Sequence, residues 1–250
     1  DGFVDLMNSY AASMGLSNTL FQNSTGLPDG NHFSSAKDLA TMTSLLINNF
    51  PETYSLYKEK YYTFNNIRQP NRNRLLWKDN SSDGVKTGHT ESAGYCLISS
   101  AKRNDMRLIA VVAGAKSDKE RFNDTQRLLE YGFRFYSTQE VIKKDNALKD
   151  VDVWGGKKNL VSLGSENNIK LTLPRTTFKN ITISYDFQNN LRAPIKEGQT
   201  LGTLVIKEGE KTLHTENLVA LNDVEAKGFF GRLWASLVLW FRGLFGLGDA

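Results

Sequence analysis

Helical periodicity gives way to short strand-like runs near residue 141, and this change constrains the fold more than any other feature of the sequence. Before it, several segments repeat apolar residues every three or four positions, as amphipathic helices do. After it, strand-like runs separated by Gly, Asn and Lys turns occupy 151–154, 169–173, 181–185, 201–206 and 213–221. Strands at this spacing predict a small all-β sandwich or barrel. The chain therefore changes fold class near residue 141.

The residues before this change begin with three predicted helices. Apolar residues recur every three or four positions from 3 to 14, and the stripe closes at Gly15, as in an amphipathic helix packed on a core. Ser35 and Asp38 have the spacing of a helix N-cap and its N3 acid, and Pro51 opens a third helix. These helices need an apolar surface to pack against.

Residues 83–115 supply that surface, because they have the runs and turn residues of a β segment. The short links around Glu91 and Asn104 predict three adjacent antiparallel strands. A helix follows, with Asp118 as its predicted N-cap, and runs to about Tyr136. The first 140 residues are therefore expected to mix helices with one antiparallel sheet.

The composition is that of an ordinary globular chain. Of its 250 residues 40% are hydrophobic, and 31 Lys and Arg against 27 Asp and Glu give a net charge of +4. The charges form no long single-sign block, so a nucleic-acid partner is not expected. Cys96 is the single cysteine, which excludes an intramolecular disulfide. The chain begins at Asp1 without a signal-peptide pattern, so we expect a processed or truncated product.

The segment 225–247 differs from everything before it. Its cations are Lys227, Arg232 and Arg242, and its wide apolar face contains Phe230, Leu233, Trp234, Leu237, Val238, Phe241, Leu244 and Phe245. The mainly apolar run 233–241 is too short to cross a bilayer, which needs about 20 residues. An aromatic face with flanking cations predicts a helix lying in the membrane interface. The alternative is a helix docked on the β domain or on a partner.

The strongest chemical signal is Lys86-Thr87-Gly88-His89, on a predicted strand. Lys-Thr-Gly on a strand edge occurs in serine acyltransferases that react with penicillin. Lys86 would supply a cation near the nucleophile, and Thr87 a hydroxyl for a substrate carboxylate. Gly88 leaves room for a substrate along the strand, and the backbone N–H of His89 can face a developing oxyanion. Alone, the match is weak, and a solvated strand entering a turn is the simpler explanation.

The motif does not stand alone, because many further segments match one family in the same order. They are 3–8, 14–16, 19–21, 25–27, 34–40, 57–60, 64–69, 71–73, 75–77 and 93–95. With the Lys-Thr-Gly-His-Thr segment 86–90, they resemble the low-molecular-mass penicillin-binding proteins, which are serine-type D-alanyl-D-alanine carboxypeptidases. The resemblance extends over essentially the whole chain.

This resemblance implies an α+β protein in three parts. Residues 1–140 would be the C-terminal part of a penicillin-binding, or β-lactamase-like transpeptidase, domain; 141–222 an all-β domain; and 223–250 an amphipathic membrane-associating helix. The implied activity removes the terminal D-alanine of peptidoglycan pentapeptides through a serine acyl-enzyme, without a metal or cofactor. β-Lactam antibiotics would be further ligands. The implied location is the periplasmic face of the bacterial inner membrane, with the helix at 225–247 on the membrane surface.

Two family motifs are absent from this sequence. Members carry Ser-x-x-Lys, with the nucleophile and its base, and Ser-x-Asn, both upstream of the helix that begins near Phe3 here. The local matches at Ser34, Ser55, Ser99 and Ser165 are interpreted as chance, because none has the expected context. We therefore expect the chain to be inactive alone.

Two arginines match family positions near the cleft. Arg72 lies in the Asn-Arg-Asn run before Lys86, with one residue fewer between them than in the family, and Arg121 lies in the first turn of the helix after the sheet. A guanidinium suits the terminal carboxylate that a carboxypeptidase recognises. The alternative for each is a surface ion pair, with Glu120 or Asp124 near Arg121.

Two other functions stay open. A β-lactamase of the same fold class is disfavoured by the β domain and the C-terminal helix, and penicillin turnover would reveal it. A non-catalytic module could instead hold the membrane or the cell wall through residues 141–250. Binding of that segment alone to vesicles or sacculi would favour this alternative.

Overall fold

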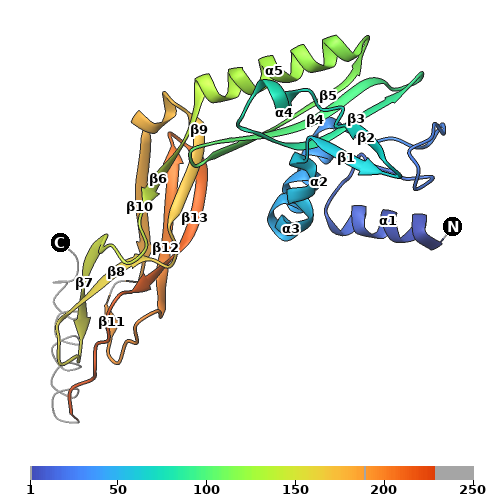
Figure 1. The fold of residues 1–250 in the computed structure, drawn as a ribbon. Coiled ribbons are helices and arrows are strands. Elements are labelled where there is room, and N and C mark those ends of the chain that lie inside the picture. The colour runs from blue at the N-terminus through green and yellow to red at the C-terminus, as the bar shows by residue number, and fades with distance from the viewer. Residues whose placement is uncertain (1, 189, 229–250) are drawn as a thin grey trace. The chain divides into compact units, whose positions relative to one another are not determined.

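The structure is a computed structural model that describes residues 2–188 and 190–228 (Figure 1). The chain forms two compact units, divided between Ser137 and Thr138. The first unit contains α1 (Gly2–Ser13), α2 (Ala36–Asn49), α3 (Pro51–Tyr54), the 3₁₀ turn η1 (Ser55–Lys58), β1 (Tyr61–Phe64), β2 (Ile67–Pro70), α4 (Leu75–Lys78), β3 (Ser82–Thr90), β4 (Gly94–Arg103), β5 (Met106–Ala115) and α5 (Asp118–Phe135).

A three-stranded antiparallel sheet, in the order β3-β4-β5, forms the centre of the first unit. This confirms the strands predicted around the links at Glu91 and Asn104. Helix α5 packs along β4 and β5, and α2 also contacts β5 (Figure 1). The core between sheet and helix contains Leu75, Leu97, Ala101, Met106, Ala110, Leu129 and Phe133. The outer strand β3, which carries the Lys-Thr-Gly segment, is therefore fixed to a packed sheet along one edge.

Helix boundaries follow the capping residues closely. Ser35 caps α2 as predicted, since its hydroxyl accepts a hydrogen bond from the backbone N–H of Asp38. For α5 the predicted cap was wrong by one residue. Ser117, in extended backbone conformation, is the N-cap and accepts from the N–H of Glu120, so Asp118 is the first helical residue. This shift leaves the carboxylate of Asp118 available for another partner.

A hairpin of β1 and β2 also lies in the first unit, and the sequence did not predict it. Its strands pair antiparallel with Tyr61 opposite Pro70, and all eight of its strand residues are exposed. With no buried face, these strands lack the alternation that predicts a half-buried strand. The short helix α4 after the hairpin was missed as well.

The second unit is all-β, as predicted. Its elements are β6 (Tyr136–Ile142), which starts two residues before the division, β7 (Lys149–Trp154), β8 (Leu160–Ser165), β9 (Ile169–Pro174), the 3₁₀ turn η2 (Thr177–Lys179), β10 (Ile181–Phe187), β11 (Leu191–Arg192), β12 (Thr200–Glu208) and β13 (Lys211–Ala220). They form a six-stranded sheet, β10-β12-β13-β8-β7-β11, and a two-stranded sheet of β6 and β9. The sequence missed β6, β8 and β11. A separate core includes the fully buried Val161, Leu163, Leu204, Ile206 and Leu218.

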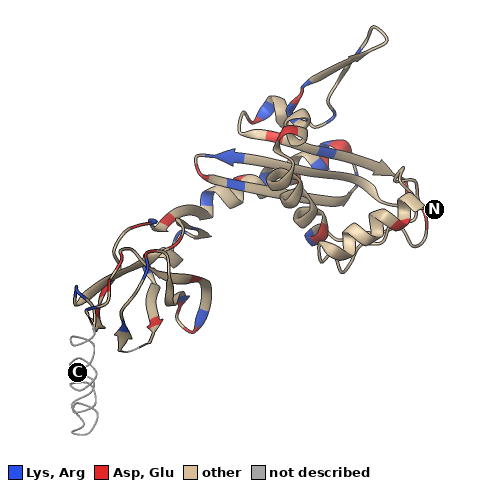
Figure 2. Ribbon diagram, turned by 90° about the horizontal axis from the view of Figure 1, so that it is seen from below, with Lys and Arg blue, Asp and Glu red and all other residues tan. Residues whose placement is uncertain are grey.

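Charged residues of both signs are scattered over both units (Figure 2). This matches the lack of a long single-sign run in the sequence. Within residues 2–188 and 190–228, no helix is long and apolar enough to cross a membrane. The helix predicted at 225–247 lies mostly outside the described residues.

Candidate active site

Strand β3 places the motif at the outer edge of the first unit's sheet. Among the described residues β3 pairs with β4 alone, so its other edge has no strand partner. Lys86 is exposed and Thr87 is buried, as expected for successive residues of a strand. The Nζ of Lys86 donates a 2.6 Å hydrogen bond to the carbonyl oxygen of Thr87. The cation therefore lies next to the backbone of its own motif.

Gly88 and His89 are exposed where β3 faces the start of β4. A Cβ atom on Gly88 would have the Cβ of Cys96, 3.9 Å away, as its nearest neighbour outside its own stretch of chain, so the space over Gly88 is open. The ring of His89 lies 4.0 Å from the ring of Tyr95, its cross-strand partner. This geometry allows another extended chain to lie against β3, while the catalytic roles of these residues stay predictions.

A partly buried polar network holds the start of β3. Tyr54, which is 5% exposed, donates a 2.7 Å hydrogen bond to Asp83. Arg107 of β5 contacts both oxygens of that carboxylate at 2.8 Å, and also bonds Ser100 at 2.6 Å. Burial raises the pKa of the Tyr54 hydroxyl well above its usual value; a hydrogen bond with Ser100 opposes this shift, and Asp83 adds to it. Tyr54 therefore keeps its proton and can donate to Asp83.

The backbone of β3 is also held at the carbonyl oxygen of Gly84. This oxygen accepts hydrogen bonds from Nδ2 of Asn73 at 2.7 Å and from the hydroxyl of Ser99 at 2.9 Å. Asn73 is 1% exposed, and its Oδ1 also accepts from the backbone N–H of Leu75. One buried amide thus joins the loop before α4 to the strand, two residues before Lys86.

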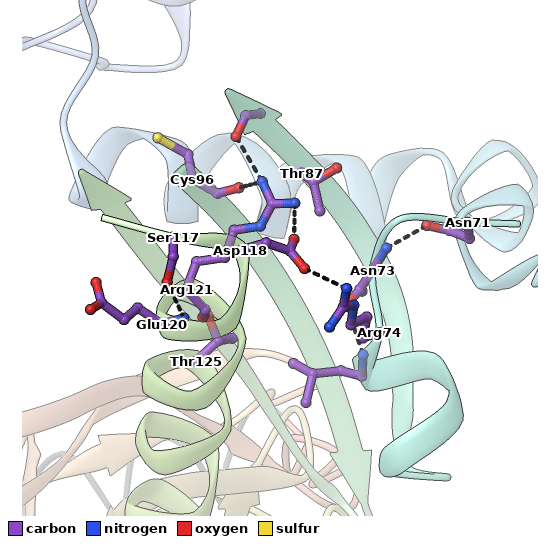
Figure 3. A network of polar contacts seen from close by, with 12 residues as sticks. Asn71, Asn73, Arg74, Thr87, Cys96, Ser117, Asp118, Glu120, Arg121 and Thr125 are labelled. Carbon is purple, nitrogen blue, oxygen red and sulfur yellow. Dashed lines mark hydrogen bonds and ion pairs between the residues drawn. The ribbon is translucent and has the colours of Figure 1, made fainter. Parts of the chain in front are cut away.

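Helix α5 reaches the far end of the motif through Arg121, whose side chain is buried. Its Nη1 donates to the carbonyl oxygens of Gly88 at 2.9 Å and Cys96 at 3.3 Å, and its Nη2 pairs with Asp118 (Figure 3). The guanidinium carbon also lies 5.3 Å from the centre of the Tyr95 ring. The structure therefore brings Arg121 to the Lys-Thr-Gly strand, as the sequence predicted.

The partner of Arg121 is not one of those considered from the sequence. Glu120 accepts from the backbone N–H of Lys116, and Asp124 pairs with Arg127. The acid that faces Arg121 is Asp118, one turn earlier on α5. The role of Arg121 in substrate binding stays a prediction, and three hydrogen bonds from its guanidinium already have acceptors within the protein.

Arg72 lies in the loop between β2 and α4, with an exposed side chain. Among the described residues, no hydrogen bond or ion pair joins it to Lys86, Thr87, Gly88 or His89. The loop itself is fixed, because the side chain of the preceding Asn71 bonds the backbone on both sides of it. The carboxylate-binding role of Arg72 therefore also stays a prediction.

The sequence missed the residues that hold β3 in place, namely Tyr54, Asn73, Arg107 and Asp118. For Asp118 there was a signal, because an acid and an arginine three positions apart lie on one helix face. For Tyr54 and Arg107 there was none, because their contacts with Asp83 span 29 and 24 residues.

The four serines whose motif matches are interpreted above as chance have hydrogen-bond partners near them in the fold. The hydroxyl of Ser34 bonds the hydroxyl of Thr19. The other three donate to backbone carbonyl oxygens: Ser55 to Glu52, Ser99 to Gly84 and Ser165 to Asn167.

The described residues hold no group of three His, Cys, Asp or Glu side chains that could bind a metal ion.

Two family models match the two parts of the chain. The model for D-alanyl-D-alanine carboxypeptidase matches residues 1–117, and that for the penicillin-binding protein 5 C-terminal domain matches 136–226. D-alanyl-D-alanine carboxypeptidase DacC of Escherichia coli (strain K12) is 46% identical over 248 residues, covering 98% of this chain and 62% of DacC. The crystal structure of the D-alanyl-D-alanine carboxypeptidase DacD from Francisella tularensis is 32% identical with a TM-score of 0.63, covering 90% of this chain and 68% of that one. This chain belongs to the D-alanyl-D-alanine carboxypeptidase family.

Crystal structures of penicillin binding protein 5 from Haemophilus influenzae show the same family fold. One has a TM-score of 0.74 and 39% identity to this carboxypeptidase-family chain, covering 89% of it and 66% of that chain. The family inferred from the sequence is therefore confirmed. The chain spans 62% of the length of DacC.

Proposed function

We propose that this chain supplies one wall of the active site of a serine D-alanyl-D-alanine carboxypeptidase, acting on the terminal D-alanine of peptidoglycan pentapeptides. The observation that carries the proposal is the position of Lys86 to His89. This segment lies on a free strand edge, and buried polar groups hold it at both ends. Membership of the carboxypeptidase family is the reason for assigning the acyl-transfer reaction to this strand edge.

In the proposed reaction, a serine hydroxyl attacks the carbonyl carbon of the penultimate D-alanine. The serine proton passes to the leaving amine, terminal D-alanine departs, and water then hydrolyses the acyl-enzyme ester. That serine and its base are not at matching positions in these 250 residues. Here Lys86 provides positive charge beside them, and the N–H of His89 stabilises the oxyanion.

The free edge of β3 orients the substrate in this proposal. An extended peptide can add to an exposed strand edge through backbone hydrogen bonds. Gly88 has no side chain to obstruct it, and Thr87 offers its hydroxyl to the carboxylate. A β-lactam would occupy the same place and acylate the same serine.

Labelling with a fluorescent penicillin tests the proposal on the full product of the gene that encodes this chain. We expect a stoichiometric adduct on that product and none on residues 1–250 alone, since losing the nucleophile costs on the order of 10⁶ in rate. Lys86→Ala should abolish labelling without lowering the melting temperature, because Lys86 is exposed. The matched control is Lys102→Ala, an exposed lysine on β4, which should label normally.

Three outcomes contradict this function. The full product could remain unlabelled, or residues 1–250 alone could label at Ser34, Ser55 or Ser99. Rapid turnover of penicillin in place of a stable adduct would identify a β-lactamase.

We propose further that residues 225–247 hold the protein on the periplasmic face of the inner membrane. The support is the sequence, whose aromatic face and flanking cations suit the interface between headgroups and acyl chains. There the enzyme would trim newly made peptidoglycan and so influence cell shape.

A further inference from the structure

The carboxylate of Asp118 lies between two guanidinium groups. One oxygen pairs with Nη2 of Arg121, and the other is 2.9 Å from Nη2 of Arg74, in the loop that leads into α4 (Figure 3). The side chain of Arg121 is 8% exposed, that of Asp118 32% and that of Arg74 64%. Exposed ion pairs contribute little, so the pair with Arg121 is the important one.

Arg121 in turn holds two neighbouring strands at the position of Gly88. Gly88 and Cys96 are cross-strand partners, and the Nη1 of Arg121 donates to both carbonyl oxygens. Cys96 also lies at a register shift between β4 and β5, because Tyr95 and Leu97 pair with β5 and it does not. The extra residue of this bulge lies on β5, opposite Cys96, and Arg121 adds a hydrogen bond to the carbonyl oxygen of Cys96 at this irregular point.

Arg121 needs Asp118 to remain in this place. A guanidinium removed from water is stable only when a counter-charge and hydrogen bonds replace its hydration. Among the described residues, Asp118 is the carboxylate in contact with Arg121. Without that charge, the guanidinium would turn towards solvent and release the two carbonyl oxygens.

We propose that Asp118 is a positioning residue for acylation, acting through Arg121 to hold the backbone at Gly88 and so fix Lys86 to His89. This inference rests on the proposed function. Its kinetic consequence is a lower maximal acylation rate with little change in the affinity for penicillin. A misplacement of about 1 Å at a reacting site can cost a hundredfold in rate.

The test compares Asp118→Asn with the native full gene product. Asn keeps the shape of the side chain and loses its charge, so we expect maximal acylation by fluorescent penicillin to fall about tenfold to a hundredfold. Asp118→Glu should recover part of this loss. Hydrogen–deuterium exchange should become faster in peptides from β3 and the start of β4, and stay unchanged in β12 and β13.

The matched control is Asp124→Asn, the same substitution on the same helix. Asp124 also pairs with an arginine three positions away, but at 3.5 Å and with both side chains largely exposed, 49% for Asp124 and 78% for Arg127. We expect this variant to acylate and exchange like the native protein. If it slows acylation as much as Asp118→Asn, the effect comes from helix charge and the proposal is wrong.

Further outcomes decide the remaining cases. Native acylation kinetics in folded Asp118→Asn, or slower acylation with unchanged exchange in β3, overturns the positioning role. If Asp118→Asn does not fold, Arg121→Lys keeps the positive charge but loses the planar fork that joins both carbonyls to Asp118, and it must show the same faster exchange. If the native product is not acylated at all, the proposed function fails, while the exchange data still show whether Asp118 holds the strand.

Discussion

The phenolic oxygen of Tyr54 lies 2.7 Å from the position that a Cβ atom on Gly84 would occupy. Gly84→Ala should therefore force Tyr54 away from Asp83 and weaken the network at the start of β3. Overpacking of this kind costs about 1–3 kcal/mol of unfolding free energy. Urea denaturation of native and variant proteins measures it, and an unchanged midpoint would show that Tyr54 can move freely.

Gly88→Ala is the matched comparison, four residues along the same strand. There a Cβ atom would have only ordinary contact, 3.9 Å from the Cβ of Cys96, so stability should stay within about 0.5 kcal/mol of native. Penicillin acylation of the full gene product should nevertheless slow more than about tenfold, because the methyl group would occupy the open space. Unimpaired acylation would argue that substrate does not pass over Gly88.

Tyr54→Phe should change how stability depends on high pH. Burial raises the pKa of Tyr54 in the folded protein, whereas in the unfolded chain it ionises near pH 10. Above pH 10 the folded state therefore holds a proton that the unfolded state has lost, so stability falls as pH rises. Phe removes this contribution, and the loss of unfolding free energy above pH 10 should be smaller in the variant. Parallel curves for the two proteins would contradict the raised pKa.

The two arginines to which the sequence assigns carboxylate binding, Arg72 and Arg121, should behave differently towards substrates with a free carboxylate. Arg72→Ala should weaken them by roughly 1.5–3 kcal/mol, the contribution of a charged hydrogen bond, and have no effect on a peptide with an amidated C-terminus. Arg121→Ala should impair both peptides equally, because its donors hold backbone carbonyls. Paired kcat/KM values decide this, and a carboxylate-selective loss in Arg121→Ala would restore its predicted role in binding.

The two units should differ in their resistance to proteolysis. Residues 138–228 contain a complete core with several fully buried aliphatic side chains, so we expect them to survive as a fragment. The first unit exposes Phe3, Leu6 and Tyr10 on α1, at 64%, 50% and 60%, and should be cut earlier. Limited proteolysis followed by mass spectrometry would show this order, and equal protection of both units would contradict it.

The parts of the fold that the sequence predicted are those with local signals. Spacing within a few residues was enough to predict three features. They are the capping pair Ser35 and Asp38, the antiparallel strands between Ser82 and Ala115, and the all-β second unit. The hairpin at 61–70 was missed because it has no buried face to give its strands alternation.

The motif on β3 was also recognisable from sequence, whereas the residues around it were not. Lys86 to His89 are consecutive, so their chemistry is visible without a fold. Asn73 donates a hydrogen bond to the carbonyl oxygen of Gly84 only because the loop before α4 lies against β3. No pattern in the sequence predicts that contact. Positioning groups of this kind are set by tertiary packing, which is why they appear only in the structure.

The last prediction concerns residues 225–247. A chain ending at Asp223 should stay off anionic vesicles, and the full chain should sediment with them, because the apolar face enters the interface while Lys227, Arg232 and Arg242 meet anionic phosphates. High salt should weaken this binding without abolishing it, since burial of apolar area does not depend on salt.

Substitutions separate the two contributions to membrane binding. Replacing Trp234 and Phe241 with Ser should weaken sedimentation far more than Arg242→Gln, because each large apolar side chain contributes about 1.5–3 kcal/mol on burial and each interfacial cation about 1 kcal/mol. If Arg242→Gln has the larger effect, attraction to headgroups dominates and the apolar face lies elsewhere. If truncated and full chains sediment alike, or the full chain forms a detergent-resistant dimer through this segment, the segment docks on protein and the membrane location is wrong.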